Sequence, residues 1–376
     1  MKKQNIFISI VLLVTVVILA IPFIQWLNIE KKDLNILIVD KTVEEDSYCE
    51  HKRIVHVLNH YKYNKEDKEE YTVLDYVGFR PKKDLEYEID DVENKLKKDY
   101  DLLYVADTNG VYEEEYYGEN SRGNRSQIIY GGLSLEEAEQ IEKQVEINQT
   151  PLIVEYNTFA QPTSKKSRNI MESVLNVKWT GWIGRYFDNL NYDANEEIPT
   201  WIKDNYEKQY NQNWEFKNGG FVLADQSDHI IVLEDNEDFL SKGLKFSFSK
   251  EGKDFFNIKG SVNYDYWFDI IKSDSSQVMA TYNWDLNDGG KEKLEKYNLP
   301  SSFPAITRHL ENNVPIYYFA GDFADSNKER GLYRYYNLNK IMTRFKRLSA
   351  NDDQRFQWQI YYPVMEAILE EAYELK

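Results

Sequence analysis

The longest apolar run of the chain lies at its start. Residues 6–27 contain no charged side chain and follow Met1, Lys2 and Lys3. As a helix, this run would rise about 33 Å, close to the thickness of the hydrocarbon core of a bilayer. It is longer than the roughly 7–15-residue core of a cleavable signal peptide, and no clear small-x-small cleavage site follows it. The pattern predicts an uncleaved, single-pass membrane anchor over residues 1–27.

Beyond this anchor, short apolar runs alternate with amphipathic stretches. The apolar runs cover residues 34–40, 71–79, 101–107 and 151–159, and the stretches with helical spacing cover residues 54–61, 80–99, 135–145 and 166–175. Fully apolar runs that close on a polar residue are typical of buried parallel strands. Ser134 and Glu137 form a capping box at the start of the third helical stretch. This alternation predicts an α/β fold, a parallel sheet with helices on both faces.

The pattern changes after about residue 180. A hairpin signal at residues 221–235 and apolar or alternating runs at 262–271, 277–284 and 316–326 indicate more strands, and the chain ends in helical spacing. We expect three parts: the anchor over residues 1–27, an α/β domain over 34–188, and a mixed β-rich and helical extension over 198–376. The extension either packs on the same core or stands apart. Residues 189–197, rich in Asn and Asp, are the expected boundary.

Composition excludes several classes of partner. The formal net charge is −18, and such a surface repels the phosphates of nucleic acids. One cysteine and five histidines exclude an internal disulfide and a cysteine-based zinc cluster. No metal is expected, because His56 and His60 do not form an H-E-x-x-H motif and no EF-hand spacing occurs. No cofactor is expected, because the chain has no GxGxxG or Walker lysine pattern. An apolar segment so close to the start is typical of a signal anchor, so we expect the bulk of the chain outside the cell membrane.

The strand pattern also predicts a site, because ligands of parallel sheets bind outside the carboxyl ends of the strands. Three acids that close or interrupt apolar runs are the candidate catalytic residues: Asp40, Asp107 and Glu155. The candidate ligand-binding residues are Lys41, His51, Asp75, Asn157, Thr158, Arg185, Tyr186 and Asp322. The alternative is that these acids and amides only end strands and cap helices. Glu155 is the strongest candidate, since an unpaired acid is costly to bury within the apolar LIVEYNTF.

One stretch resembles a known family. GGLSLEEAEQIEKQVEINQTPLIVEYNTFAQPT (residues 131–163) is similar to the helix-then-strand unit of class I glutamine amidotransferase-like domains, and the resemblance extends over residues 34–182. The resemblance implies a flavodoxin-like fold. The chain departs from the enzymes at their Gly-x-Cys-x-Gly elbow, because the third strand is followed by Asp107-Thr108-Asn109-Gly110. Only the fold is therefore expected to carry over. Cys49 is the single thiol, and we expect no activity to depend on it.

Two functions fit this pattern, and whether the chain is an enzyme stays open. The first is an extracytoplasmic protein that binds or processes a cell-envelope glycan, indicated by the anchor, the 29 tyrosines and 8 tryptophans, and the polar strand ends. The second is a non-catalytic scaffold or accessory subunit of a membrane complex for polysaccharide synthesis or export. An enzyme should place Asp40, Glu155 and Arg185 around one pocket within hydrogen-bonding reach. A scaffold should show these groups paired with other residues.

Overall fold

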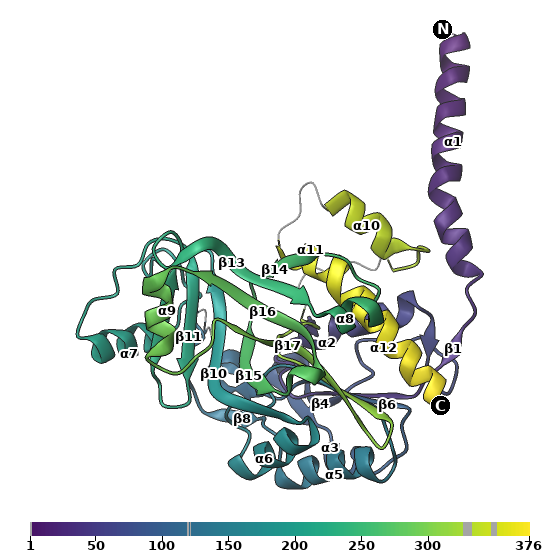
Figure 1. Ribbon diagram of the computed structural model, residues 1–376. Helices are drawn as coiled ribbons and strands as arrows, with labels where there is room; N and C mark the ends of the chain where they lie inside the picture. The colour runs from purple at the N-terminus through teal and green to yellow at the C-terminus, as the bar shows by residue number, and fades with distance from the viewer. Residues whose placement is uncertain (1, 119, 121, 326–332, 347–351) are drawn as a thin grey trace.

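A mixed ten-stranded sheet is the largest element of the protein (Figure 1). The structure is a computed structural model, and it describes residues 2–118, 120, 122–325, 333–346 and 352–376. The strand order across the sheet is β14-β13-β16-β17-β18-β9-β6-β2-β4-β5. The strands from β18 to β4 run parallel to one another, and antiparallel strands extend the sheet on both sides. The expected α/β class is confirmed, with a sheet that is mixed rather than parallel throughout.

The parallel strands coincide with the apolar runs of the sequence. They are β2 (Ile36–Asp40), β4 (Val77–Pro81), β6 (Leu102–Asp107), β9 (Leu152–Val154) and β18 (Val314–Phe319). Every residue of β2, β6, β9 and β18 is buried. Strands that are covered on both faces need apolar residues at successive positions, which explains why these segments do not alternate.

The antiparallel strands belong mostly to the second half of the chain. They are β5 (Tyr87–Ile89), β13 (Phe239–Phe248), β14 (Ser261–Tyr264), β16 (Val278–Leu286) and β17 (Ser302–Glu311). Strand β18 comes from the expected extension, yet it pairs in parallel with β9 of the expected α/β domain. The ranges 34–188 and 198–376 therefore share one sheet and one hydrophobic core.

A second, four-stranded antiparallel sheet has the order β12-β11-β10-β15. Its strands are β10 (Val177–Phe187), β11 (Gly220–Asp225), β12 (Ile230–Glu234) and β15 (Phe268–Ser273). Strands β11 and β12 form the hairpin that the sequence predicted at residues 221–235. The remaining short strands are β1 (Lys32–Asp33), β3 (Tyr63–Asn64), β7 (Val111–Tyr112) and β8 (Ile128–Tyr130). An isolated bridge joins Phe268 of β15 to Gly321, which follows β18 of the large sheet.

The helices that cover the large sheet fall into two groups. Helices α2 and α12 contact each other, as do α3, α5 and α6, and Figure 1 shows the two groups on either side of the strands. The helices are α1 (Lys2–Leu27), α2 (Cys49–His60), α3 (Val92–Leu96), α4 (Glu113–Tyr117), α5 (Leu135–Glu146), α6 (Lys165–Val174), α7 (Thr200–Tyr210), α8 (Lys250–Phe255), α9 (Asp288–Glu295), α10 (Leu338–Lys346), α11 (Asp352–Phe356) and α12 (Tyr362–Leu375). A π-helical turn, Gln357–Tyr361, joins α11 to α12. The capping box of Ser134 and Glu137 opens α5, as the sequence predicted.

The expected helix over residues 80–99 is wrong. Residues Lys83–Leu85 form a 3-10 turn, and β5 returns to pair with β4 before the short helix α3. Leu85 and Ile89 are 55% and 44% exposed, so only Val92 and Leu96 of the apolar spacing are buried. Strand pairing with β4 provides the backbone hydrogen bonds of residues 87–89. This contact between strands outweighed the helical spacing of the apolar residues.

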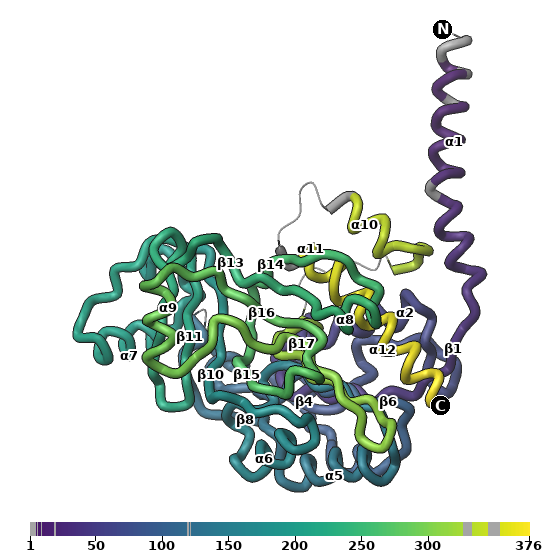
Figure 2. The backbone as a smooth tube through the Cα atoms, viewed as in Figure 1, coloured from purple at the N-terminus to yellow at the C-terminus, as the bar shows by residue number. Residues whose placement is uncertain are grey.

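Helix α1 projects away from the rest of the protein, as the tube in Figure 2 shows. Its segment Ile10–Leu27 has a mean hydropathy of 2.7, and 6% of that segment is buried. By length and composition this helix can cross a membrane, a property that signal sequences share. Its last turn packs on the body: Trp26 is 4% exposed, and its Nε1 donates to the carbonyl oxygen of His60 at 2.8 Å. The carboxyl-terminal end of α1 is therefore held against the folded part of the protein by packing and a hydrogen bond.

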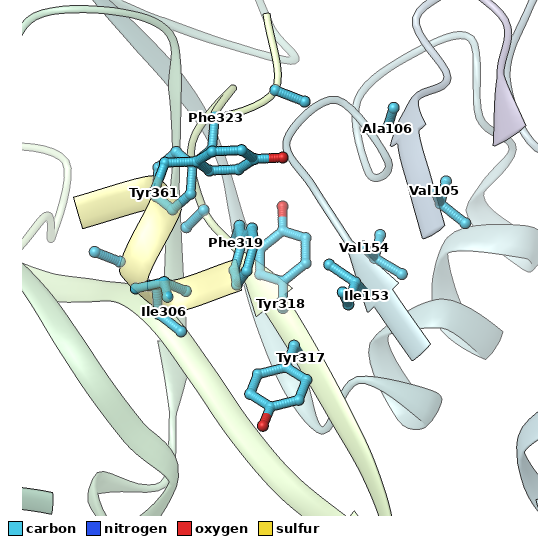
Figure 3. Close-up of a cluster of buried hydrophobic side chains, with 14 of the residues drawn as sticks. Val105, Ala106, Ile153, Val154, Ile306, Tyr317, Tyr318, Phe319, Phe323 and Tyr361 are labelled. Atoms are coloured by element: carbon cyan, nitrogen blue, oxygen red, sulfur yellow. The ribbon is translucent and has the colours of Figure 1, made fainter. Parts of the chain in front are cut away.

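The core lies where the parallel and antiparallel parts of the sheet meet. Figure 3 shows side chains of β6, β9 and β18 side by side, with Tyr361 of the π-helical turn near Phe319 and Phe323. Several of these side chains are tyrosines, and Tyr361 and Tyr318 are fully buried. A buried tyrosine hydroxyl needs a hydrogen-bond partner. Tyr318 donates to Asp269, and Tyr361 lies 2.9 Å from the hydroxyl of Tyr104. The core therefore contains buried carboxyl groups next to the carboxyl edge of the sheet.

Candidate functional site

Three acidic side chains stand at the carboxyl ends of neighbouring parallel strands. Asp40 ends β2 and Asp107 ends β6, and the two are register partners. Glu155 follows β9, and its backbone N–H donates to the carbonyl oxygen of Val105 at 3.0 Å. Asn157 reaches the same place, since its Nδ2 donates to Asp107 at 3.1 Å. The expected grouping of Asp40, Glu155 and Asn157 at one sheet edge agrees with these contacts.

The Asp40 carboxylate binds His51. Asp40 Oδ2 lies 2.6 Å from Nδ1 of His51, and both side chains are fully buried. Nε2 of His51 lies 2.9 Å from the carbonyl oxygen of Val73, which only accepts, so Nε2 carries a proton. The other Asp40 oxygen accepts from the backbone N–H of Thr42 at 3.0 Å. Asp40 is thus fully hydrogen-bonded within the protein.

The Asp107 carboxyl organises the loop that follows β6. Its Oδ1 accepts from Thr42 Oγ1 at 2.7 Å and from the backbone N–H of Asn109 at 2.6 Å. Burial raises the pKa of Asp107 to about 7, and the charge of Asp40 adds to this effect, while the hydrogen bonds from Asn109, Thr42 and Asn157 oppose it. This carboxyl can therefore hold or release a proton near neutral pH, which is the range that acid–base chemistry uses.

Glu155 holds the loop after β18 against the sheet. Its Oε2 accepts from the backbone N–H groups of Phe323 and Ala324 at 2.8 and 2.9 Å, and its Oε1 is bonded to the hydroxyl of Tyr104. The side chain is completely buried, and burial raises the pKa of Glu155 to about 8 against the effect of its hydrogen bonds and of Arg53. All three contacts are structural, so Glu155 positions the loop and does not line an open pocket.

Two more acids approach the same edge from other elements. Burial is the main cause of the raised pKa of both Asp322, after β18, and Glu50, in the first turn of α2. The neighbouring carboxyls Asp325 and Asp107 raise the pKa of Asp322 further, and Asp40 does so for Glu50. Burial and the neighbouring carboxyls thus both disfavour the charged form of Asp322 and of Glu50. Across the described residues, no group of three or more His, Cys, Asp or Glu is placed to hold a metal ion.

Arg185 stands near this edge without reaching the three acids. Its Nη2 donates to Glu197, and its guanidinium lies 5.4 Å from the ring centre of Trp267 and 5.8 Å from that of Tyr266. The hydroxyl of Tyr266 in turn donates to Asp325 at 2.6 Å. Tyr266 therefore contacts both the cation and an acid of this edge. No hydrogen bond joins Arg185 to Asp40, Asp107 or Glu155 in the part of the chain that the structure describes.

Four other candidates have structural contacts elsewhere. Lys41 Nζ donates to both oxygens of Glu137 at 2.7 and 2.6 Å, and burial lowers the pKa of Lys41 while Glu137 opposes that shift. Asp75 precedes β4 and lines a cavity of about 600 Å³ at the amino ends of the strands, where its pKa is lowered by hydrogen bonds from Thr72 and Lys65 that outweigh burial. Tyr186 donates to Asp235 at 2.7 Å, and Thr158 donates to the carbonyl oxygen of Glu155 at 2.9 Å. The side chains of Lys41, Asp75 and Tyr186 lie outside the cluster of acids, whereas Thr158 is bonded to the backbone of Glu155.

The Cys49 thiol is a poor nucleophile in this setting. Its Sγ donates to Glu50 Oε1 at 3.1 Å. Burial, followed by the charges of Glu50 and Asp325, raises the pKa of the Cys49 thiol. Because the thiolate is the reactive form, a raised pKa keeps the group unreactive at neutral pH.

A groove of about 510 Å³ opens beside the acidic edge. The loop after β6 forms one side, and β10, β11 and the start of α7 form the other. Its aromatic side chains are Tyr112, Trp179 and Trp201, and its polar side chains include Asn109, Gln161, Asp225, Gln226 and Asp228. Arg125 lies 4.0 Å from the ring centre of Trp201 and pairs with Asp228. The groove adjoins the acids, because the backbone of Asn109 is hydrogen-bonded to Asp107.

Several residues of this region carry weak or no signals in the sequence. Thr42 links Asp107 to the loop, as its Oγ1 also accepts from the backbone N–H of Gly110 at 2.9 Å. Asp269 in β15 is completely buried, and burial raises its pKa to about 7. An acid inside the apolar segment FDIIKS is the same signal that identified Glu155, so Asp269 could have been found. The groove residues of β10, β11 and α7 carried no comparable signal.

The comparisons with known proteins return no relative by sequence. No protein family model matches the chain, and no curated protein matches it. Solved structures that resemble it include a beta-galactosidase from Rahnella sp. R3, with a TM-score of 0.32, 10% identity and coverage of 85% of this chain and 32% of that chain. A beta-galactosidase from Bacillus circulans sp. alkalophilus has a TM-score of 0.32 and 8% identity, over 81% of this chain and 30% of that one. The carbohydrate deacetylase Agd3 has a TM-score of 0.33 and 10% identity, over 77% and 30%.

The chain thus spans 30–32% of the length of these three proteins. All three are carbohydrate-active enzymes by name. At these TM-scores the likeness carries no argument about the fold or the activity of this chain.

Proposed function

We propose that this chain is a membrane-anchored, extracytoplasmic protein that binds a cell-envelope glycan in the groove between the loop after β6 and strands β10 and β11. The observation that carries the proposal is the lining of that groove, where Tyr112 and Trp201 stand among amides and carboxylates and Trp179 is buried beneath them. The C–H faces of sugar rings pack on aromatic rings, and sugar hydroxyls pair with planar amide and carboxylate groups. The volume of about 510 Å³ lies within the usual range of small-ligand sites.

The location follows from the first helix. Helix α1 is apolar and projects from the body, which supports a single membrane span. Lys2 and Lys3 precede it, and basic residues favour the cytoplasmic side. We therefore place the sheets and the groove outside the cell.

The contacts of the candidate catalytic residues favour glycan binding without catalysis. Asp40 is bonded to His51, Glu155 to Tyr104 and to backbone amides, and Arg185 to Glu197. A catalytic group has to reach its substrate, and these side chains are occupied. This observation also favours the second candidate function, a non-catalytic accessory subunit of a membrane complex for polysaccharide synthesis or export.

We also propose that the parallel part of the sheet belongs to the amidotransferase-like group of flavodoxin-like folds. Its strand order β4-β2-β6-β9-β18 supports this, because it follows the 2-1-3-4-5 order of that fold class. The chain has no thiol at the turn after β6, where the sequence is Asp107-Thr108-Asn109-Gly110. Glutamine hydrolysis through a cysteine elbow is therefore not part of the proposal.

Calorimetric titration of the full chain in detergent tests the glycan site. The probes are soluble oligomers of hexose, N-acetylhexosamine and hexosamine. Trp201→Ala should weaken binding of the best oligomer by at least about tenfold, since a buried tryptophan contact commonly contributes that much. The matched control is Tyr117→Ala, because Tyr117 is 51% exposed and lies outside the groove lining. Absence of binding to every oligomer, or equal binding by Trp201→Ala and the parent, refutes the groove as a glycan site.

A further inference from the structure

A second cavity, of about 1110 Å³, lies at the foot of α1. Pro22 and Gln25 of α1, the chain after α8, and helices α10 and α12 line it. Figure 1 shows α10 beside the end of α1 that joins the body. The backbone N–H of Tyr336, just before α10, donates to the carbonyl oxygen of Pro22 at 3.0 Å. The cavity is therefore fixed at the junction between the apolar helix and the rest of the protein.

The packed end of α1 sets the level at which the helix can enter a membrane. Trp26 is buried against the body, and Lys62 Nζ donates to the carbonyl oxygens of Leu27 and Ile29, each at 3.0 Å. Because this last turn is packed against the folded part of the protein, it cannot enter the hydrocarbon core unless the folded part enters with it. The free apolar part, residues 6–21, would rise about 24 Å, a few ångströms less than the hydrocarbon core of about 30 Å. Pro22 then lies at the boundary, and α10 faces the headgroup layer.

Three cations project from the rim of this cavity. Lys259, Lys340 and Arg344 are exposed, and none of them forms an ion pair within the part of the chain that the structure describes. The two acids in the lining have other partners: Glu366 accepts from Tyr61 at 3.0 Å, and Glu370 accepts from Lys32 and, at 3.0 Å, from Tyr63. The protein as a whole carries a net charge of −18. Three cations stand against two carboxylates in this lining, and the charge of Lys340 opposes the burial that raises the pKa of Glu366. The junction beside the apolar helix therefore has a small local excess of positive charge in an acidic protein.

We propose that this rim binds the phosphate groups of anionic phospholipids in the bilayer that α1 enters, and so holds the body in one orientation on the membrane. The proposal rests on the anchor part of the proposed function and not on the glycan groove. Guanidinium and ammonium groups match phosphate oxygens. Lysine and arginine close to an anionic bilayer surface each favour contact by about fivefold. Ile341 of α10 is half-buried and lines the same cavity, and Met342 packs against the core, so α10 is fixed to the body beside the cations.

Hydrogen exchange of the full chain in lipid nanodiscs tests this surface. The two compositions are phosphatidylcholine alone and phosphatidylcholine with phosphatidylglycerol. Backbone amides of α10 should exchange at least about tenfold more slowly in the anionic discs, because three cations together favour the contact by on the order of 100-fold. The triple variant Lys259→Gln/Lys340→Gln/Arg344→Gln should lose this difference, and raised salt should reduce it in the parent.

The matched control changes three exposed lysines that lie away from α1, Lys143→Gln/Lys166→Gln/Lys272→Gln. It alters the net charge equally and should keep the lipid dependence of the parent. Equal exchange in both lipids, or a lipid dependence that survives in the first triple variant, overturns the proposal. Carbonate extraction from liposomes of the same two compositions tests the anchor by itself. A chain that is extracted refutes the anchor, whereas a retained chain without lipid-dependent exchange refutes only the headgroup contact.

Discussion

Replacing Glu155 by glutamine should remove a pH-dependent loss of stability without disturbing the fold. The neutral acid and the amide have the same shape at this position. The oxygen of the introduced amide would accept from the N–H groups of Phe323 and Ala324, as Glu155 Oε2 does at 2.8 and 2.9 Å. The amide nitrogen would donate to Tyr104, whose hydroxyl lies 2.9 Å from that of Tyr361 and can donate to it. Glu155→Gln therefore keeps every hydrogen bond of the protonated form.

The magnitude follows from the shift of the pKa of Glu155, which burial raises from its ordinary value of 4.5 to about 8. Between these two pH values the folded protein holds the proton and the unfolded chain does not. The stability from this proton is thus complete below pH 4.5 and is lost as the pH rises to about 8. From pH 5 to pH 8 the parent should lose about 4 kcal/mol that the variant keeps, at about 1.36 kcal/mol per pH unit.

Urea unfolding of the full chain in detergent, followed by tryptophan fluorescence from pH 5 to pH 8, measures this difference. Asp107 and Asp269 also have pKa values raised to about 7, mainly by burial, but they titrate in both proteins and cancel in the comparison. The control is Glu136→Gln, which changes an exposed glutamate of α5. A parent-minus-variant difference that does not change with pH would refute the reasoning. A variant that loses its fold at pH 5 would show that the ionised carboxylate is needed.

Two further substitutions test the roles assigned to Lys41 and Cys49. Lys41→Met should cost about 3–5 kcal/mol of unfolding free energy in the same assay, because it leaves Glu137 charged and buried without its cation; a loss no larger than that of Lys143→Met, on the exposed side of α5, would contradict this role. Cys49→Ser should leave oligosaccharide affinity within about twofold, and iodoacetamide should label the parent thiol slowly at pH 8 because burial and Glu50 raise its pKa. Labelling as fast as that of the urea-unfolded chain would show a reactive cysteine.

Sequence patterns predicted the structure correctly where they depend on residues within one short segment. The apolar runs at Ile36–Asp40 and Leu102–Asp107 became buried parallel strands, and Ser134 with Glu137 formed the capping box. The acids at the strand ends met at one edge, because parallel strands in register bring their carboxyl ends together. The same reasoning misplaced Asp75, because β4 begins at Val77, after it.

Partners that come from distant parts of the chain could not be read from a local pattern. Glu155 was singled out because a buried acid needs partners, yet those partners are the backbone of residues 323 and 324 and the hydroxyl of Tyr104. Lys41 follows a strand as a binding residue would, but Glu137 of α5 takes its charge. The helical spacing over residues 80–99 was overridden by the pairing of β5 with β4. In each case, the deciding interaction joins two separate segments of the chain, so neither segment alone reveals it.

The sequence by itself determined the apolar helix, the α/β class, the position of the acids at strand ends and the absence of a cysteine elbow, since each depends on residue type and local spacing. The tertiary structure decided that β18 joins the sheet beside β9, that most of the candidate acids are paired, and that aromatic residues of β10 and α7 face the loop after β6. It also placed Lys259, Lys340 and Arg344 around the foot of α1. Burial, desolvation and charge pairing depend on which segments meet, and only the packed chain specifies that.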